Sequence, residues 1–159
     1  MAIALGFLAA LVCLSVAAVF AAAESAFATV SRSDIDDAHE EGRRGAVRLQ
    51  RVVADPLVHT YVLTFLRQFT EALATVFIAY AYLQVFDVGW EAVVCTVVTA
   101  SVAVFVVAGV SPRNVARHYP LQTALLLGGP VSGLRTALGP LALVPVWLGN
   151  MVPPDRVRG

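Results

Sequence analysis

Charged residues are scarce in this sequence. They account for 14% of the 159 residues, and the formal net charge is zero, which excludes a basic field that would attract nucleic acid. Lysine is missing, so all eleven cationic residues are arginine, a bias to which we give no functional meaning. Hydrophobic residues account for 58%, which is too apolar for a soluble globular domain. The composition therefore indicates a small polytopic membrane protein.

Cysteine and the common catalytic motifs are also rare or missing. Cys13 and Cys95 lie far apart within apolar runs, so we expect buried free thiols and neither a disulfide nor a metal site. The sequence contains no H-E-x-x-H, no G-x-S-x-G and no glycine-rich phosphate loop, and its histidines do not have the spacing of metal ligands. These absences predict that the protein is not an enzyme.

The longest run without a charged residue covers residues 2–23 and ends at Glu24. As a helix it would be about 33 Å long, enough to cross the hydrocarbon core of a bilayer. A cleaved signal peptide is the alternative, but no basic residue precedes Arg32 and the run is longer than a signal requires. Ala17, Ala21 and Glu24 share one helical face, and small residues allow another helix to approach. We therefore expect Glu24 to point at other helices and not at lipid.

Three apolar stretches predict an all-α membrane protein with spans at about residues 2–30, 57–86 and 90–110. The polar segment 31–55 predicts a helical hairpin on the membrane surface. Its basic cluster places that hairpin on the cytoplasmic side by the positive-inside rule: Arg43, Arg44, Arg48 and Arg51. With three spans, the N-terminus lies outside the cell and the C-terminus in the cytoplasm.

The region after the third span, residues 114–151, is apolar but repeatedly interrupted. Pro112 is expected to end the third span, and glycines and prolines divide the chain beyond it: Gly128, Gly129, Pro130, Gly139, Pro140 and Pro145. Neither half of this apolar region is long enough to cross a bilayer with ease. We expect broken amphipathic juxtamembrane helices along the inner membrane face, with a kinked fourth span as the alternative, and a short cytoplasmic tail at 152–159.

The second span carries a polar stripe on one helical face: Thr64, Gln68, Glu71 and Thr75. Arg67 lies four residues before Glu71, so the two side chains can pair. One interpretation is a structural ion pair whose arginine extends to the cytoplasmic interface; the other is a polar stripe that faces Glu24 inside the bundle. We favour the structural pair, because an arginine beside a carboxylate cancels much of its attraction for a cation.

Taken in order, these features resemble the transmembrane domain of the CNNM/CorC family, often labelled hemolysin-related and implicated in magnesium and cobalt efflux. The first span ends in an F-x-A-x-E-x-A signature formed by Phe20, Ala22, Glu24 and Ala26. The motif that closes the third span reads G-E-x-x-P-K in the family and spans residues 108–113 here. The resemblance implies a multi-pass plasma-membrane protein, surrounded by the lipid bilayer, that binds Mg²⁺ and forms a homodimer or a heterodimer with a related membrane subunit.

Three positions depart from the family pattern. Ala21 replaces a serine, Gly109 replaces the acidic residue of the closing motif, and residues 67–70 contain no asparagine where the family has one. In the family these positions line a dehydrated Mg²⁺ site, and magnesium requires oxygen ligands. By the resemblance, the metal ligands here would be Glu24, Glu71 and Gln68 in a degenerate site, with structural roles for Arg67, Gly109 and Pro112.

Two functions are implied by this resemblance. The first is a divalent-cation transport or efflux domain with a degenerate ion site. The second is a non-transporting membrane partner or scaffold of a transport-competent relative. Family members usually continue into paired CBS domains that bind nucleotide, and this sequence stops at Gly159. We expect those domains to be absent or to be supplied by another polypeptide.

Overall fold

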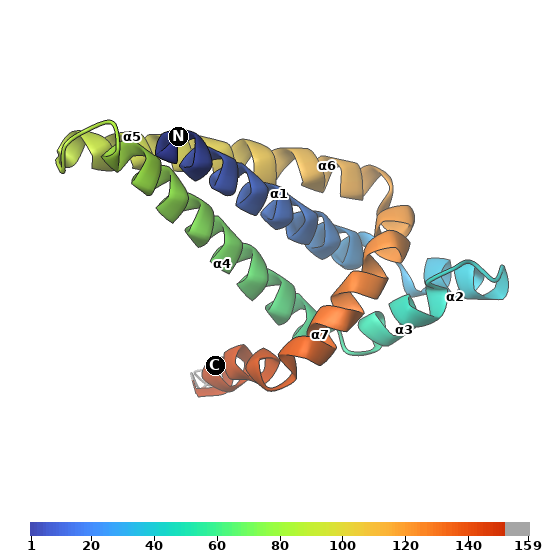
Figure 1. Cartoon of the computed structure of the whole chain (residues 1–159). Coiled ribbons are helices and arrows are strands. Elements are labelled where there is room, and N and C mark those ends of the chain that lie inside the picture. Colours follow the sequence, from blue (N-terminus) through green and yellow to red (C-terminus); the bar gives the residue numbers. More distant parts are fainter. Residues whose placement is uncertain (152–159) are drawn as a thin grey trace, which may run out of the picture.

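The computed structural model describes residues 1–151, without the side chains of residues 57, 111, 132, 134–136, 138–143, 145, 146, 149 and 150. The predicted cytoplasmic tail, 152–159, lies outside the described residues. Within 1–151 the chain forms helices and no β-strand. In chain order (Figure 1) these are α1 (Ala2–Thr29), α2 (Arg32–Glu40), α3 (Ala46–Ala54), α4 (Pro56–Leu83), α5 (Trp90–Ala103), the π-helical segment η1 (Val104–Val110), α6 (Ser111–His118) and α7 (Pro120–Met151).

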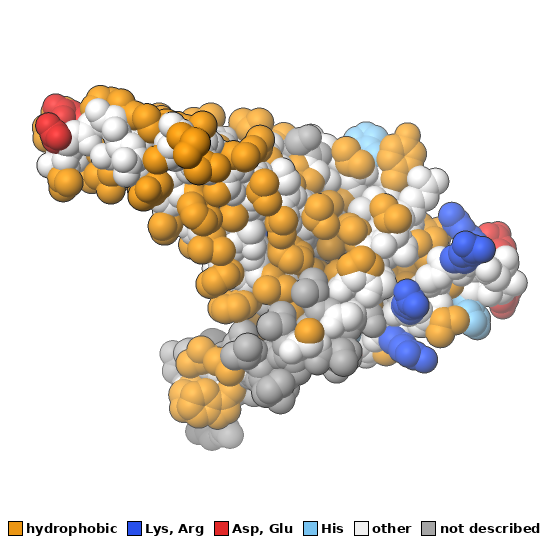
Figure 2. All heavy atoms as spheres, in the orientation of Figure 1, with side chains coloured by type: hydrophobic (Ala, Val, Ile, Leu, Met, Phe, Trp, Pro, Cys, Tyr) orange, Lys and Arg blue, Asp and Glu red, His pale blue; other side chains and the backbone are white. Residues whose placement is uncertain are grey.

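Three helical stretches in the described part of the chain are long and apolar enough to cross a membrane: α1, most of α4, and the continuous run from α5 through η1 to α6. In their most apolar windows only 22%, 22% and 17% of the residues are buried inside the molecule. Hydrophobic side chains therefore cover much of the outer surface along these helices (Figure 2), as expected for surfaces that face lipid. The predicted all-α architecture with three candidate spans is confirmed.

Small residues let α1 pack closely along α4. Ala10, Ala17 and Ala21 are buried on the inner face of α1. At the N-terminal end, a Cβ atom added to Gly6 would lie 3.0 Å from the Cβ of Ala81 and 3.2 Å from the carbonyl oxygen of Phe77. Close approach of this kind strengthens dispersion contacts, which replace the hydrophobic effect as the main attraction between helices in lipid.

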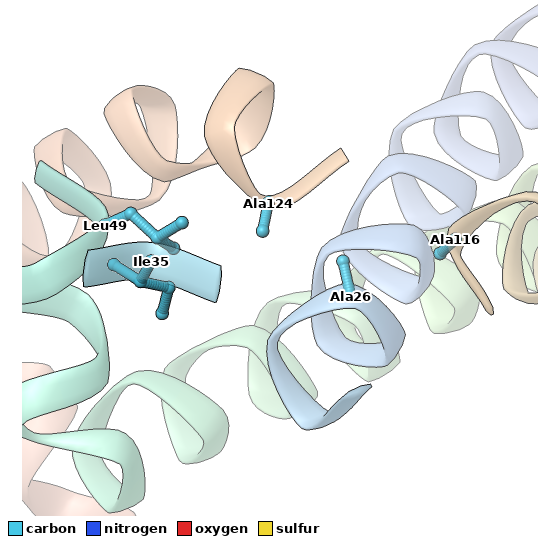
Figure 3. Packing of buried hydrophobic residues seen from close by; sticks show 5 residues of the cluster. All are labelled: Ala26, Ile35, Leu49, Ala116 and Ala124. Carbon is cyan, nitrogen blue, oxygen red and sulfur yellow. The ribbon is translucent and has the colours of Figure 1, made fainter. Parts of the chain in front are cut away.

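The hairpin of α2 and α3 is docked onto the long helices through an apolar cluster, shown in Figure 3, that joins five helices: Ala26, Ile35, Leu49, Ala116 and Ala124. The cap of α2 is Ser31, whose hydroxyl accepts a hydrogen bond from the backbone N–H of Asp34 in a capping box. Gly42 and Gly45 form the turn before α3 with φ angles of +66° and +90°, which favour glycine. The predicted helical hairpin is therefore present, with both glycines in its turn.

Two predicted helix interruptions are not found. Pro112 does not end the third span, because it lies in the first turn of α6, where a missing N–H costs little, and the π-helical η1 precedes it. The helix continues to His118. The glycines and prolines after residue 127 do not divide α7 either, which is one helix over Pro120–Met151 and changes direction along its length (Figure 1).

The tight contact between α1 and α4 predicts the effect of Gly6→Leu. The larger side chain would overlap Ala81 and the α4 backbone, so we expect a loss of about 1–3 kcal/mol of stability, typical of overpacking. Thermal unfolding of the detergent-purified protein should show a lower Tm. Ala4→Leu is the matched control, because Ala4 is exposed on the same helix. An equal Tm for both variants would contradict the close packing.

Candidate functional site

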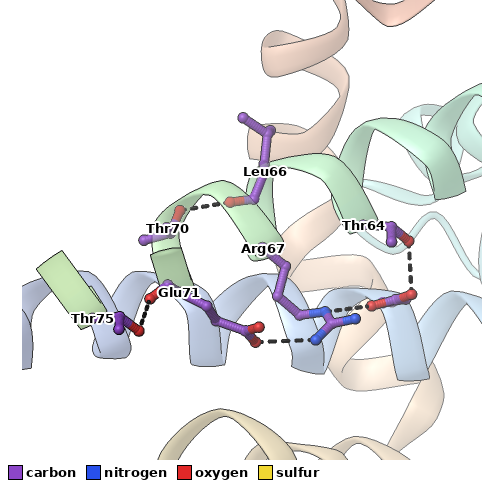
Figure 4. Close-up of polar contacts among 7 residues, drawn as sticks. Thr64, Leu66, Arg67, Thr70, Glu71 and Thr75 are labelled. Atoms are coloured by element: carbon purple, nitrogen blue, oxygen red, sulfur yellow. Dashed lines mark hydrogen bonds and ion pairs between the residues drawn. The ribbon is translucent and has the colours of Figure 1, made fainter. Parts of the chain in front are cut away.

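One arginine connects two carboxylates from different candidate spans. The Arg67 side chain on α4 donates from Nε to Oε2 of Glu24 on α1, at 3.0 Å, and from Nη1 to Oε1 of Glu71, also at 3.0 Å (Figure 4). Thr64 Oγ1 donates to the other oxygen of Glu24 at 2.9 Å. We call Glu24, Thr64, Arg67 and Glu71 the charge cluster.

Helical spacing and small residues bring the charge cluster together. Thr64, Arg67 and Glu71 occur at i, i+3 and i+7 on α4, and the fully buried Ala17 and Ala21 bring α1 close enough for Glu24 to reach them. The two interpretations of the polar stripe are therefore combined in the structure: Arg67 pairs with Glu71 within α4, and it also binds Glu24 across the helix interface.

The charge cluster is partly shielded. The side chains of Arg67, Glu71 and Glu24 retain 16%, 17% and 25% of their exposure. Beside these side chains, α7 packs over the interface between α1 and α4, where Val131 contacts Ala23 and Leu63. A salt bridge in such surroundings is screened less than a surface pair, and removing one partner leaves charge without compensation.

A groove of about 670 Å³ opens next to the charge cluster, between α4 and the α5–η1 helix. Its polar wall comes from α4, and its opposite wall from α5 and η1. The lining residues on the two sides are Arg67, Gln68, Glu71, Ala72 and Thr75, then Val97, Ala100, Ser101, Val104, Phe105 and Gly109. Of the residues singled out from the sequence, Gln68, Glu71, Arg67 and Gly109 therefore meet at one groove. Glu24 is joined to it through Arg67, and Pro112 is not among the lining residues.

Two threonine hydroxyls on α4 form hydrogen bonds within their own helix. Thr70 Oγ1 donates to the carbonyl of Leu66 at 2.6 Å, and Thr75 Oγ1 donates to that of Glu71 at 3.0 Å (Figure 4). The donor of each hydroxyl is thus used, while the oxygen lone pairs remain free to accept a hydrogen bond or approach a cation. Thr75 presents such an oxygen at the groove wall.

The second wall contains the π-helical segment. In η1 the hydrogen bonds run from i to i+5, a rare arrangement that occurs often at functional sites. Gly109 lies in this segment and lines the groove; a Cβ atom there would meet only the carbonyl oxygen of Val104, at 3.6 Å, an ordinary contact. The position at which the resemblance implies an acid can therefore accept the first atom of a side chain.

The charge cluster is not a ready-made metal centre. Among the described residues, no group of three or more His, Cys, Asp or Glu side chains could hold a metal ion. Nδ1 of His59 lies 2.7 Å from the carbonyl oxygen of Asp55, the N-cap of α4, and Nδ1 of His118 lies 2.8 Å from that of Asn114. Two carboxylates and one guanidinium leave one net negative charge in the charge cluster. A divalent cation at Glu24 or Glu71 would have to share that carboxylate with Arg67 or displace the guanidinium.

Sequence reasoning identified both glutamates and Arg67 but missed the bond between Arg67 and Glu24. The signal was available: within the interiors of the three apolar stretches these are the only charged residues. Charges in a membrane interior pair with one another, so three such residues on neighbouring helices predict one network. In the part of η1 that borders the groove, the resemblance to the family had singled out Gly109, whereas Val104 and Phe105 had no comparable signal.

Removing the shared cation should destabilise the bundle. Arg67→Met leaves Glu24 and Glu71 without their common partner, and we expect a loss of about 2 kcal/mol, below the value for a fully buried pair because these groups retain some exposure. The measurement is thermal unfolding in detergent, with Arg117→Met on the exposed face of α6 as the control. Adding Glu24→Gln and Glu71→Gln to Arg67→Met should restore part of the Tm, since the effects are coupled. Equal Tm values for Arg67→Met and the control would contradict a structural role for the charge cluster.

Comparison with known proteins extends this description. Residues 8–154 match the family model "CNNM: Cyclin M transmembrane N-terminal domain". A UPF0053 protein of Mycobacterium bovis and one of Mycobacterium tuberculosis are each 31% identical to this chain over 150 residues. The alignment covers 92% of this chain and 33% of each relative, so the chain spans about a third of the length of the curated relatives it matches. The match over nearly its whole length shows that the chain belongs to the CNNM transmembrane domain family.

Proposed function

We propose that this chain is the ion-conducting membrane domain of a divalent-cation transport or efflux protein, with Mg²⁺ or Co²⁺ as the transported ion. The observation that carries the proposal is the groove between α4 and α5–η1. It places a carboxylate, an amide and hydroxyl oxygens, from Glu71, Gln68, Thr75 and Ser101, within an apolar helix bundle. Oxygen ligands of these kinds suit Mg²⁺, which keeps part of its water shell and needs few protein ligands.

Arg67 has a defined part in this proposal. With no ion bound, its guanidinium pairs with both Glu71 and Glu24 and holds α1 against α4. When a hydrated divalent cation enters the groove, Arg67 keeps its bond to Glu24 and releases Glu71, whose carboxylate then faces the ion. Release of one ion pair gives the ion differential affinity for two arrangements of the bundle, which alternating access requires.

A second candidate is a non-transporting membrane partner or scaffold of a transport-competent relative, with which it would form a heterodimer. It is favoured by Gly109, which supplies no carboxylate to the groove, and by Arg67, which engages both available glutamates. Under this function the charge cluster would only stabilise the fold, and the ion ligands would come from the other subunit.

Ion flux through proteoliposomes tests the transport proposal. Vesicles that contain the purified chain and an internal Mg²⁺ indicator should show saturable uptake of external Mg²⁺. We expect Glu71→Gln to reduce the rate of Mg²⁺ uptake by roughly 10–100-fold or more. Loss of a residue that supports a metal ligand has an effect of that size at metal sites. Glu91→Gln is the control, because Glu91 lies in the first turn of α5, away from the groove lining.

Adding a carboxylate to the groove at Gly109 in η1 tests the same proposal in the opposite direction. Gly109→Glu restores the acid of the family motif at a position where the added Cβ fits, so Mg²⁺ uptake should rise and its half-saturating concentration should fall. Gly109→Gln is the matched control of similar size without charge. Background flux in the wild type and in Gly109→Glu would reject transport by this chain alone and support the partner function.

A further inference from the structure

A second charged feature lies on the hairpin, which precedes the N-terminal end of α4. Arg48 and Arg51 lie three residues apart on one face of α3, Arg44 lies in the turn that precedes α3, and all three are exposed. Together with Gly45 and Val47 they line a pocket of about 470 Å³. We call this pocket the arginine groove. Figure 2 shows basic side chains gathered at the end of the molecule where α2 and α3 lie.

The guanidinium groups of the arginine groove are available for a ligand. Among the described side chains, none of these three arginines forms an ion pair with a carboxylate. The contact between α3 and α2 uses a different residue: Gln50 Nε2 donates to Oδ1 of Asp36 at 3.1 Å. The polar contact of the hairpin thus leaves the arginine face free.

Two glycines fix the position of the arginine groove against α7. A Cβ atom on Gly129 would lie 3.1 Å from Nη1 of Arg48, so the bare backbone at this position lets the guanidinium lie across α7. A Cβ atom on Gly45 would lie 3.0 Å from the carbonyl oxygen of Leu125, which shows how closely the turn approaches the same helix. Packing on α7 therefore partly preorganises the site, which reduces the entropy lost on binding.

The surroundings of the arginine groove select the class of ligand. Arg51 precedes the membrane-length helix α4 by five residues, so the pocket lies where an apolar span begins. Val47, which is 48% exposed, adds an apolar contact within the same lining. Guanidinium groups bind phosphate oxygens through paired hydrogen bonds, and anionic lipids are attracted to basic segments beside spans.

We propose that Arg44, Arg48 and Arg51 form a binding site for the phosphate headgroup of an anionic phospholipid, whose glycerol and upper acyl chain contact Val47 and the adjoining membrane helices. The site is separate from the groove at Glu71 and does not depend on ion transport. It goes beyond a topology signal, because a topology signal requires positive charge alone, whereas this site requires guanidinium groups at these three positions.

Lipid binding to the full chain in detergent tests the proposal. The probe is phosphatidylglycerol, titrated into the purified protein and counted as bound adducts by native mass spectrometry, with phosphatidylcholine as the neutral comparison. We expect tighter binding of phosphatidylglycerol, reduced about fivefold for each arginine changed to glutamine and about a hundredfold in the triple variant. The matched control removes the same charge elsewhere, by Arg32→Gln, Arg113→Gln and Arg117→Gln, and should change the affinity less than about fivefold.

Further measurements distinguish a specific lipid-binding site from nonspecific attraction to positive charge. The triple lysine variant of Arg44, Arg48 and Arg51 keeps charge and membrane orientation but loses paired hydrogen bonding, so its affinity should lie between wild type and the glutamine variant. It also gives a result if the glutamine variant does not fold. Equal loss in the control variant, full affinity in the lysine variant, or displacement of the lipid by equimolar inorganic phosphate would each overturn the proposal.

Discussion

Pairing of charge inside an apolar bundle is the constraint on which this structure depends. A carboxylate at the end of a long uncharged run cannot be left facing hydrocarbon, and Glu24 forms hydrogen bonds with Arg67 and Thr64 on the neighbouring helix. Because Arg67 also holds Glu71, the same guanidinium fixes the rotation of α4 and the position of α1 beside it. Small residues then allow the two helices to close around this contact.

This pairing also determines what the neighbouring groove can do. Most of its side-chain oxygen atoms lie on α4, with one more on Ser101 of α5, but the strongest ligand among them, Glu71, is already bonded to Arg67. An ion that enters therefore competes with a side chain as well as with water. The bond between Arg67 and Glu71 distinguishes the two proposed functions. In a transporter an entering ion can displace Arg67 from Glu71, whereas in a partner subunit the bond only stabilises the fold.

Much of the architecture could be predicted from the sequence, because it depends on the length of apolar runs and on local signals. The three candidate spans, the hairpin with Gly42 and Gly45, and the inward direction of Glu24 depend on residues close together in the chain. The continuity through Pro112 could not be predicted. Proline removes one hydrogen bond, and whether a helix ends or adapts there depends on backbone geometry that the sequence does not encode locally.

The candidate site was only partly predictable for the same reason. Helical spacing places Gln68, Glu71 and Thr75 on one face, but it cannot say which residue of another helix lies opposite. The connection from Arg67 to Glu24 spans forty-three positions in the chain. It requires the crossing of α1 and α4 to be known, as does the meeting of Gly109 with that polar face.

The π-helical segment η1 has a mechanical consequence for the region beyond it. Its wider turns contain more residues than those of an α-helix, and they lie near the middle of the third candidate span. If one bond of this segment changed partner to the regular pattern, everything after it would turn by about 100° about the helix axis. Such a rotation would turn α6 and its arginines about the axis of the span while α5 stayed in place, so a change at the groove wall would be transmitted to the end of the span at His118.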